Sequence, residues 1–390
     1  MKCCAECFGD RGLRRSIIPL RSAEVGQCSY CGSDNVATVV PAQLSEYFEL
    51  LISAYRQDAG GKLLVQWFRE EWGLFGHSRM DDSRAKDLLA EILDDGEIVR
   101  QTFAPIDYIA EALRKHANLD LGLAIKVGAA MAQGRVPHII VSNALSEWEE
   151  LRDELMYHNR FFPDTRVDLK RLEFLFSFLT LYADEVPNLW YRARIQSGEA
   201  PITASEMGAP PRRIASHGRA NPAGIPYLYL GSSPLSAIAE IRPQTGEVAC
   251  VAEFGTPHEL KLVDLRSPKK MVSPFLLEDA EDICRMRSDL PFLERLGDEL
   301  TRPVLPQAAA IDYTPSQYLC EFIKKCGYGG VIYRSSVSEG INLALFDPAL
   351  ARCGTFRNSS AASASASLLF PRPLRASIFA VTAIVGYAAP

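Results

Sequence analysis

The chain lacks an apolar run that could cross a membrane as a helix. No stretch reaches the roughly 18 to 20 apolar residues that such a helix needs, and the apolar segment 377–389 is too short. The amino terminus begins with cysteines and lacks the apolar core of a signal peptide. We therefore expect a cytoplasmic protein without a membrane partner, in a compartment that keeps its ten cysteines reduced.

The sequence also lacks an excess of positive charge. It carries 42 Lys and Arg against 48 Asp and Glu, a formal net charge of −6. Dedicated nucleic-acid binders usually contain a basic domain, so the net charge does not support a nucleic-acid partner, although local basic patches would allow one. No G-x-G-x-x-G turn leads from a strand into a helix, which argues against a dinucleotide held as a redox cofactor.

The length of 390 residues predicts two or three domains, at about 150 residues each. Changes in composition and periodicity divide the sequence into four segments. We expect a cysteine knuckle at 1–40, an all-helical domain at 41–186, an α+β domain at 187–349 and a Ser/Ala-rich tail at 350–390. Because the tail has no apolar period, we expect it to be disordered or poorly placed and without a functional role. The alternative for its apolar end is a weak surface-packing segment.

Two CxxC pairs lie in the first segment. Cys4 and Cys7 form one pair and Cys28 and Cys31 the other, with twenty residues between them. Four thiolates at this spacing are typical of a structural zinc site, and four cysteine ligands leave no open position for catalysis. Cys3 is a neighbour that could compete with Cys4. The alternative is a set of free thiols in a disordered leader.

Apolar residues at three- and four-residue spacing predict helices in the second segment. The stretches that carry this pattern are 44–56, 85–95, 107–117, 146–162 and 168–185. Within one of them, Arg152 and His158 are separated by five residues, a spacing similar to that of HEPN ribonucleases, where two such residues act on a phosphodiester. The same residues also fit an ion pair between Arg152 and the preceding glutamates, with His158 at the helix end.

The third segment alternates strands and helices irregularly, which predicts an α+β domain with a mixed sheet. One predicted helix follows Ser233 as its N-cap, with Pro234 at the first helical position. Another covers 315–326, with Thr314 as N-cap and Gln317 closing a capping box. A charged helical insert lies near 274–300. The predicted strands are 189–195, 227–230, 248–254, 260–265, 330–333 and 342–346.

One stretch of this segment, 216–243, brings three functional side chains together. Arg219 lies in a Gly/Pro-rich loop, Tyr229 in a short strand and Glu240 near the end of the following helix. A loop arginine, a strand tyrosine and a helix glutamate in this order are expected to form one wall of a pocket. The alternative is an ordinary strand–helix unit with a surface ion pair between Arg219 and Glu240.

Residues 188–348 resemble the RES domain family. The resemblance rests on LWYRAR with Arg192, the GRANPAG loop, YLYLGSSPLSAIAEIRP and the later IYRSSVSEGINLALFDP, all in the family's order. Tyr229 lies ten positions after Arg219, and Glu240 eleven after Tyr229, as in the family pattern. Family loops commonly contain an aromatic where this chain has Ala220. Residues before 187 resemble, more loosely, an HEPN-like helical domain preceded by cysteine knuckles.

The resemblance implies an ADP-ribosyltransferase-like fold that acts on NAD⁺ as a substrate. Family members are toxins that cleave NAD⁺ as glycohydrolases or phosphorylases, or that transfer ADP-ribose to protein, and a cognate antitoxin protein often accompanies them. We therefore expect an NAD⁺-cleaving enzyme. The alternatives are a protein ADP-ribosyltransferase, a defence or toxin module whose HEPN-like domain binds or cleaves RNA, and an inactive scaffold.

The arginines of the resemblance suit the pyrophosphate of NAD⁺. A planar guanidinium binds phosphate oxygens with paired hydrogen bonds, so Arg192 and Arg219 are expected to clamp it. Arg194 lies on the same strand face as Arg192 and could fill the same role. The alternative for Arg192 and Arg194 is a pair of solvated strand charges.

The remaining residues suit the ribose and the leaving group. Cleavage builds positive charge on the ribose, which a carboxylate at Glu240 would stabilise in the transition state. Tyr229 could stack on a ring or bond the ribose, and Ser335 or its neighbour Ser336 could hold the amide or a phosphate. The alternatives are core packing for Tyr229, a surface ion pair for Glu240 and turn positions for both serines.

Overall fold

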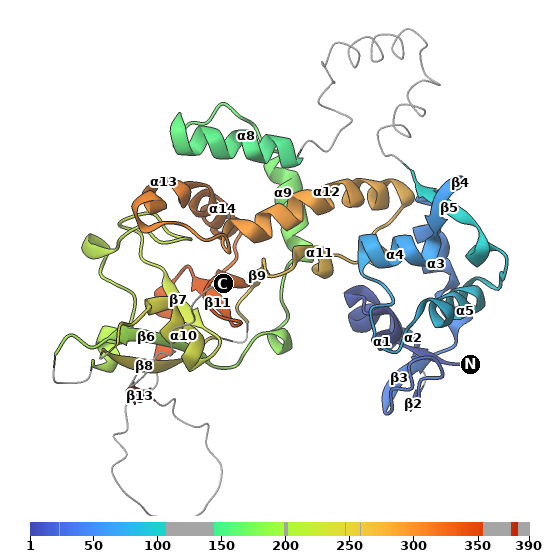
Figure 1. The fold of residues 1–390 in the computed structure, drawn as a ribbon, viewed down its shortest axis with the longest axis horizontal. Helices are drawn as coiled ribbons and strands as arrows, with labels where there is room; N and C mark the ends of the chain where they lie inside the picture. The colour runs from blue at the N-terminus through green and yellow to red at the C-terminus, as the bar shows by residue number, and fades with distance from the viewer. Residues whose placement is uncertain are drawn as a thin grey trace, which may run out of the picture. The chain divides into compact units, whose positions relative to one another are not determined.

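The computed structural model describes residues 1–22, 24–106, 144–198, 202–245, 247–257, 259–353 and 376–380. The chain divides into two compact units (Figure 1). One comprises residues 1–146 with 269–294, and the other residues 147–268 with 295–390. The predicted boundary between residues 186 and 187 therefore falls inside the second unit. The predicted helix at 107–117 lies outside the described residues.

The first unit opens with a small antiparallel sheet in the order β1-β3-β2. The strands are β1 (Cys3–Cys4), β2 (Glu24–Gly26) and β3 (Val36–Val39), and Cys3 pairs with Val39. The short helix α1 (Ala5–Phe8), a π-helical turn (Leu13–Ile17) and α2 (Ile18–Arg21) connect β1 to β2. This arrangement places the first CxxC pair at the β1–α1 junction and the second pair in the loop after β2.

The rest of the first unit contains helices and a two-stranded sheet, so the prediction of an all-helical domain is wrong here. Helix α3 (Ser45–Ile52) ends before β4 (Tyr55–Leu63), which pairs antiparallel with β5 (Thr102–Pro105). Gly61 permits this pairing, because a Cβ there would lie closer than 3.0 Å to the carbonyl oxygen of Phe103. The other helices are α4 (Leu64–Trp72), α5 (Asp82–Leu93) and short 3₁₀ turns at Pro41–Leu44 and Ile98–Arg100.

The segment 269–294 completes the core of the first unit. Phe275 packs on Phe48 with ring centroids 4.8 Å apart. Ser273 donates a 2.8 Å hydrogen bond to the buried carboxylate of Asp10. Arg287 donates to the carbonyl oxygen of Ala54 at 3.2 Å. The elements of this segment are α11 (Pro268–Met271), a 3₁₀ turn (Pro274–Leu276) and the first part of α12 (Ala280–Glu299), and the division between the units falls within α12.

The second unit is built on an eight-stranded mixed sheet in the order β12-β8-β6-β7-β11-β10-β9, with β13 also paired to β8. Only β9 and β10 run parallel, so the prediction of a mixed α+β sheet is confirmed for the described strands. The strands are β6 (Trp190–Ile195), β7 (Leu228–Gly231), β8 (Val248–Gly255), β9 (Leu262–Asp264), β10 (Gly330–Arg334), β11 (Ile341–Leu345), β12 (Arg352–Cys353) and β13 (Ala376–Ala380).

Helix α10 (Pro234–Ile241) packs on β6, β7 and β8 (Figure 1). Ala237 of the helix meets Ala193 of β6 and Val251 of β8 in a buried cluster. The predicted N-cap is confirmed, because the Ser233 side chain accepts from the Ser236 amide and Pro234 occupies the first turn. The cap and the apolar face therefore fix the helix on the sheet with its carboxyl end near β11.

The capping box predicted for the later helix α14 (Thr314–Lys325) is wrong. Tyr313 is the N-cap residue, and it makes no side-chain cap. Gln317 instead donates to the carbonyl oxygen of Gly218, far away in sequence. The remaining helices of this unit are α8 (Ala144–Tyr157), α9 (Leu169–Phe178), α13 (Ala309–Asp312) and 3₁₀ turns at Ala183–Glu185, Ala204–Met207, Arg212–Ile214, Pro306–Ala308 and Pro348–Leu350.

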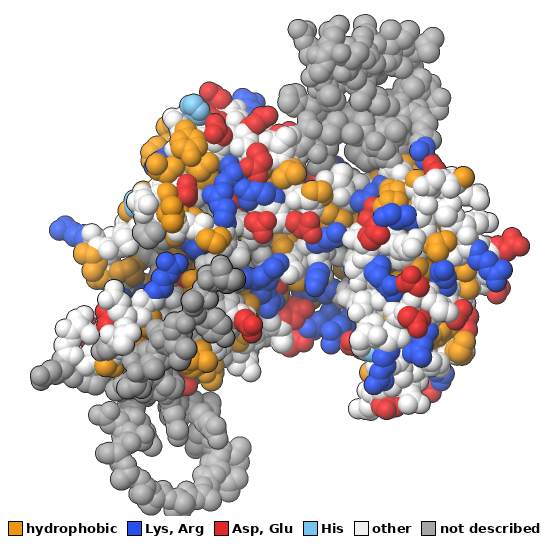
Figure 2. All heavy atoms as spheres, viewed as in Figure 1, with side chains coloured by type: hydrophobic (Ala, Val, Ile, Leu, Met, Phe, Trp, Pro, Cys, Tyr) orange, Lys and Arg blue, Asp and Glu red, His pale blue; other side chains and the backbone are white. Residues whose placement is uncertain are grey.

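Strands are present where we expected a disordered tail. Strand β12 and strand β13 both pair antiparallel with β8. The structure thus gives Ala376–Ala380 a place in the sheet, and residues 354–375 and 381–390 lie outside the described part. Among the described residues, no helix combines the length and the apolar character that crossing a membrane requires. Acidic and basic side chains are intermixed on the face shown in Figure 2.

Candidate functional site

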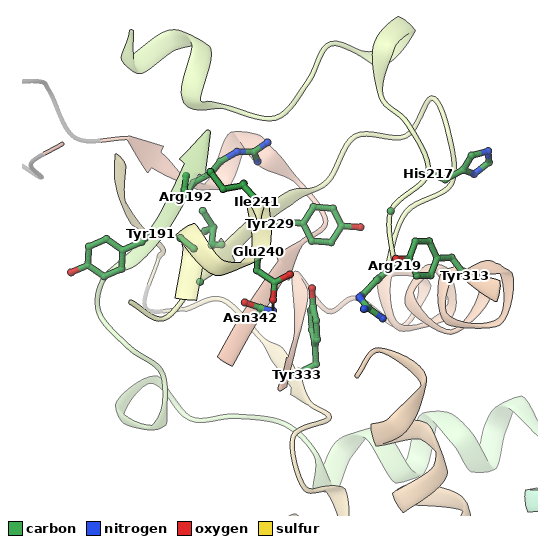
Figure 3. Close-up of a pocket in the computed structure, with 15 residues that line it drawn as sticks. Tyr191, Arg192, His217, Arg219, Tyr229, Glu240, Ile241, Tyr313, Tyr333 and Asn342 are labelled. Atoms are coloured by element: carbon green, nitrogen blue, oxygen red, sulfur yellow. Dashed lines mark hydrogen bonds between the residues drawn. The ribbon is translucent and has the colours of Figure 1, made fainter. Parts of the chain in front are cut away.

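The second unit contains a cavity of about 320 Å³ between β6, β7, α10 and the loop that follows residue 216. Figure 3 shows the side chains around it. Four residues predicted from the sequence line this cavity together, namely Arg192, Arg219, Tyr229 and Glu240. The full lining is Tyr191, Arg192, Ala193, His217, Gly218, Arg219, Tyr229, Leu230, Gly231, Ala237, Glu240, Ile241, Tyr313, Tyr333 and Asn342.

The loop that carries Arg219 is folded around one buried amide, Asn221. Its Nδ2 donates to the carbonyl oxygens of Ser216, Pro222 and Ile225 at 3.1, 3.0 and 2.9 Å. Its Oδ1 accepts a 2.6 Å hydrogen bond from the Tyr229 hydroxyl. A buried amide with several partners is costly to remove, because each partner would then lie unsatisfied in the interior. Asn221 therefore fixes the loop to strand β7.

Helix α14 holds the same loop from the other side. Ser316 donates to the carbonyl oxygen of Arg219 at 2.6 Å, and Gln317 Nε2 donates to that of Gly218 at 2.9 Å. Gly218 leaves no room for a side chain, since a Cβ would lie closer than 3.0 Å to both the Tyr229 hydroxyl and Asn221 Oδ1. The backbone on which Arg219 stands is thus fixed by bonds on both sides.

Arg219 points into the cavity with part of its guanidinium engaged. Its Nη1 donates to the carbonyl oxygen of Arg302 at 2.6 Å, and its Nη2 to Ser336 Oγ at 3.1 Å. The guanidinium lies over the Tyr313 ring, 5.4 Å from its centroid. In the described part of the chain Arg219 makes no ion pair with Glu240, so the alternative of a surface pair is wrong. The aromatic stacking and two bonds leave further N–H groups for a ligand.

Glu240 lines the cavity and is exposed, and the protein holds one of its carboxylate oxygens. Its Oε1 accepts from Ser335 Oγ and from Asn342 Nδ2, both at 2.7 Å. Ser335 thus touches the predicted carboxylate, and Ser336 touches Arg219. Neither serine lines the cavity itself. In this structure both serines contact a predicted site residue rather than the cavity.

The two arginines of strand β6 take different places. Arg192 lines the cavity, and its buried Nη1 has no hydrogen-bond partner in the described residues. Burial, and then the nearby charge of Arg194, lower the pKa of Arg192 to about 10, which still leaves a cation at neutral pH. Arg194 donates to the carbonyl oxygen of Gly208 at 3.2 Å and is not part of the lining. The geometry therefore favours Arg192 as the cavity arginine.

Tyr229 contributes its ring to the cavity, while its hydroxyl is bonded to the loop. The hydroxyl donates to Asn221 Oδ1 and accepts from the Ala220 amide at 3.0 Å. Burial raises the pKa of Tyr229 far above its usual value, so the hydroxyl stays protonated. Ala220, where the chain departs from the family loop, is fully buried and does not line the cavity.

Among the lining residues that the sequence did not predict are three polar ones, Tyr313, Tyr333 and Asn342. Tyr333 and Asn342 face each other in the pairing of β10 with β11, and both are buried. The available signal was a polar residue, Asn342, at the start of an otherwise apolar strand. Tyr313 directly precedes α14, and only the tertiary packing of the chain brings it to the cavity, so no local pattern in the sequence predicted it.

The first unit contains the predicted metal-binding set. The sulfurs of Cys4, Cys7, Cys28 and Cys31 are buried and lie within 4.8 Å of one another. Cys4 lies 4.0 Å from Cys7 and 3.5 Å from Cys31, and Cys7 lies 3.3 Å from Cys28. Four thiolates at about 2.3 Å from one ion would lie about 3.8 Å apart, so this cluster fits a tetrahedral metal. Cys3 is buried but is not a member of the set.

Arg152 and His158 do not form a paired site. Arg152 is buried and makes 2.6 Å ion pairs with Glu149 and Glu299. His158 is exposed and lies 3.4 Å from Asp153. The predicted ion pair with a preceding glutamate is confirmed for Glu149, whose side chain is 42% exposed, and Arg152 also pairs with the buried Glu299. A guanidinium held by two carboxylates is not free to bind a phosphodiester, so the HEPN-type nuclease hypothesis finds no support in this arrangement.

One comparison with known protein families matches the part of the chain that contains the cavity. Residues 189–364 match the model of the RES domain family, a match that covers less than half of the chain and agrees with the resemblance seen in residues 188–348. The match does not extend to the cysteine knuckle or to the helical region before it. No curated protein matches the sequence. A chain in the crystal structure of the M. tuberculosis MbcT–MbcA toxin–antitoxin complex aligns with 14% identity and a TM-score of 0.28. The alignment covers 47% of this chain and 87% of that one, and a score this low carries no argument.

Proposed function

We propose, from the premise that residues 189–364 match the RES domain, that the cavity binds NAD⁺ and that the protein cleaves the bond between ribose and nicotinamide. Water or phosphate is the acceptor, which makes the enzyme a glycohydrolase or a phosphorylase. The observation that carries this proposal is the joint presence in one cavity of two arginines, Arg192 and Arg219, and one carboxylate, Glu240.

The arginines suit the pyrophosphate. Arg192 presents a buried N–H group that has no partner among the described residues, and a buried donor without a partner is costly unless a ligand satisfies it. Arg219 retains N–H groups beyond the two that bond Arg302 and Ser336. Charge-assisted hydrogen bonds to phosphate oxygens are the strong ones, so these two side chains would bind the pyrophosphate and fix its orientation.

Glu240 suits the reacting ribose. Ser335 and Asn342 hold its Oε1, which orients the carboxylate before substrate arrives. As the bond to nicotinamide breaks, positive charge develops on the ribose ring. A preorganised carboxylate stabilises that charge more than it stabilises the ground state, and it also hydrogen-bonds ribose hydroxyls or orients the attacking acceptor. The ring of Tyr229 offers a flat surface for stacking.

The cysteine set of the first unit would hold one structural Zn²⁺. Four buried thiolates supply the ligands that zinc prefers and leave no open coordination position, so the ion would stabilise the fold and take no part in the reaction. We further propose that the protein acts in the cytoplasm, and that its partner is a cognate antitoxin protein, as the resemblance implies.

The test is NAD⁺ consumption by the purified full-length protein, with and without added phosphate. We expect ADP-ribose in water and ADP-ribose 1″-phosphate with phosphate. Glu240→Gln should lower kcat/KM about 10²- to 10³-fold, the usual cost of losing one group that stabilises transition-state charge. Glu259→Gln, which changes an exposed carboxylate outside the cavity, is the matched control.

Absence of NAD⁺ consumption, or equal rates for the wild type and Glu240→Gln, would refute the proposal. A mass shift of one ADP-ribose on an added protein, in place of free products, would instead identify a protein ADP-ribosyltransferase.

A further inference from the structure

Asn342 is a buried polar residue in the wall of the cavity. It is the second residue of β11, only 4% exposed, and the apolar residues Leu343, Ala344 and Leu345 that follow it are fully buried. Its backbone pairs with Tyr333 on one side and Gly231 on the other, and both of these residues also line the cavity. Nothing in its own strand explains an amide at this position.

The amide of Asn342 has a fixed orientation. Its Nδ2 donates to Glu240 Oε1 at 2.7 Å. An ionised carboxylate only accepts hydrogen bonds, so the amide must direct its NH₂ group toward Glu240 and its Oδ1 away from it. That Oδ1 is buried and has no hydrogen-bond partner in the described residues. A buried acceptor without a partner in a cavity wall points to a ligand that supplies the donor.

Glu240 offers a second acceptor next to the first. Ser335 and Asn342 both bond Oε1, and Oε2 has no protein partner in the described part of the chain. The 2.7 Å bond between Asn342 Nδ2 and Glu240 Oε1 places the two side chains beside each other, and each retains one oxygen without a protein partner in the described residues. The two acceptors, Asn342 Oδ1 and Glu240 Oε2, suit a ligand with two neighbouring hydrogen-bond donors. The two neighbouring hydroxyls of a ribose are such a pair of donors.

We propose that Asn342 Oδ1 accepts a hydrogen bond from one hydroxyl of the nicotinamide ribose while Glu240 Oε2 accepts from the neighbouring hydroxyl. Asn342 is then a specificity-determining residue for the diol, and through Nδ2 it also positions the carboxylate. This inference rests on the proposed function, because it takes NAD⁺ as the substrate of the cavity.

The experiment compares NAD⁺ with two analogues, each lacking one hydroxyl of the nicotinamide ribose. The enzymes are the full-length wild type, Asn342→Leu and Asn342→Ser. For the wild type, removal of the hydroxyl bound by Asn342 should lower kcat/KM about ten- to hundredfold, because it leaves a buried acceptor unpaired. For both variants the same removal should cost less than about threefold, since neither leucine nor the shorter serine places an acceptor at the position of Oδ1. Asn342→Ser keeps the measurement possible if the leucine variant folds poorly.

The pH profile of Asn342→Asp provides a second measurement, which would not change if Asn342 had a purely structural role. This substitution keeps the shape of the side chain and places a second carboxylate against Glu240. Two carboxylates in contact resist joint ionisation, so the acid limb of the kcat/KM profile should move to higher pH. Asn188→Asp, the same change at an exposed position outside the cavity, should leave the profile in place.

The outcomes separate the two proposals. If the wild type does not consume NAD⁺, the proposed function and this inference fall together. If it consumes NAD⁺ but the variants lose activity equally on NAD⁺ and both analogues, the inference alone is overturned. Equal kcat/KM of the wild type on NAD⁺ and on both analogues would overturn it as well.

Discussion

Replacement of Gly218 by alanine tests how tightly the loop 216–225 is held. The new Cβ would lie 2.9 Å from Tyr229 Cζ and closer still to the Tyr229 hydroxyl oxygen and to Asn221 Oδ1. Real Cβ atoms essentially never come that close, and both neighbours are fixed. The Tyr229 hydroxyl and Asn221 bond each other at 2.6 Å, and Gln317 holds the backbone of Gly218 at 2.9 Å. The methyl group can therefore enter only if the loop moves away from β7.

The cost follows from this overpacking. An extra methyl group in a well-packed interior typically destabilises by about 1 to 3 kcal/mol. For a unit of this size, that corresponds to a fall in Tm of about 2 to 12 °C. The loss of activity should be larger than the stability change alone suggests, because Arg219 follows directly and its guanidinium would be displaced. A shift of about 1 Å in a substrate-positioning group costs up to about 10²-fold in rate.

The assay is NAD⁺ consumption together with thermal unfolding, and Gly198→Ala is the matched control. A Cβ at Gly198 meets nothing within 4 Å, so this variant should retain wild-type kcat/KM and Tm. We expect Gly218→Ala to lose about 10- to 100-fold in kcat/KM at a temperature where it is folded. The reasoning would be refuted by a Gly218→Ala enzyme with wild-type activity and Tm, or by an equal loss in Gly198→Ala.

Three further predictions concern the remainder of the chain. Metal analysis should give about one zinc per chain, and the double variant Cys4→Ser, Cys28→Ser should lose it; a full metal content in that variant would exclude the thiolate site. Glu299→Gln removes one carboxylate from buried Arg152 and should destabilise the second unit by about 3 to 5 kcal/mol in denaturant unfolding; an unchanged midpoint would contradict a structural ion pair. Burial raises the pKa of the Asp10 carboxyl from its usual 3.8 to about 6. The folded state therefore binds this proton more tightly than the unfolded state does. The stability that protonated Asp10 contributes is present below pH 3.8 and is lost as the pH rises through 6. Relative to Asp10→Asn, the wild type should lose about 3 kcal/mol of unfolding free energy between pH 3 and 7, and a constant difference would argue against a buried, titrating carboxyl.

The sequence predicted features that depend on local order. Strands β6 to β11 of the second unit, the N-cap at Ser233 and the shared cavity of Arg219, Tyr229 and Glu240 all follow from residue type and short spacing. Alternation of apolar and polar residues over a short stretch predicts a strand wherever that strand lies in the fold. A serine followed by proline predicts the start of a helix. The CxxC cluster is of the same kind, because two short knuckles define it.

Predictions that depend on contacts between residues far apart in the sequence were wrong, or were not made. Gln317 has the right spacing for a capping box, but its amide bonds a loop 99 residues away. Tyr55 ends a helical pattern in the sequence, yet it begins β4 because β5 supplies the ladder partners. Asn342 resembles any polar strand residue until its contact with Glu240 is seen. In each case a tertiary bond outweighs a local preference worth a few tenths of a kcal/mol to about 1 kcal/mol.

The interleaving of the two units along the chain has a consequence for synthesis on the ribosome. The first unit cannot close its core until residue 294 has emerged, because Phe275 and Ser273 arrive late. The cavity forms later still, because Asn342, which bonds Glu240, lies on β11, one of the last described strands. A nascent chain that stops before β11 therefore lacks a complete cavity. The proposed NAD⁺-cleaving activity would therefore be absent until β11 has emerged from the ribosome.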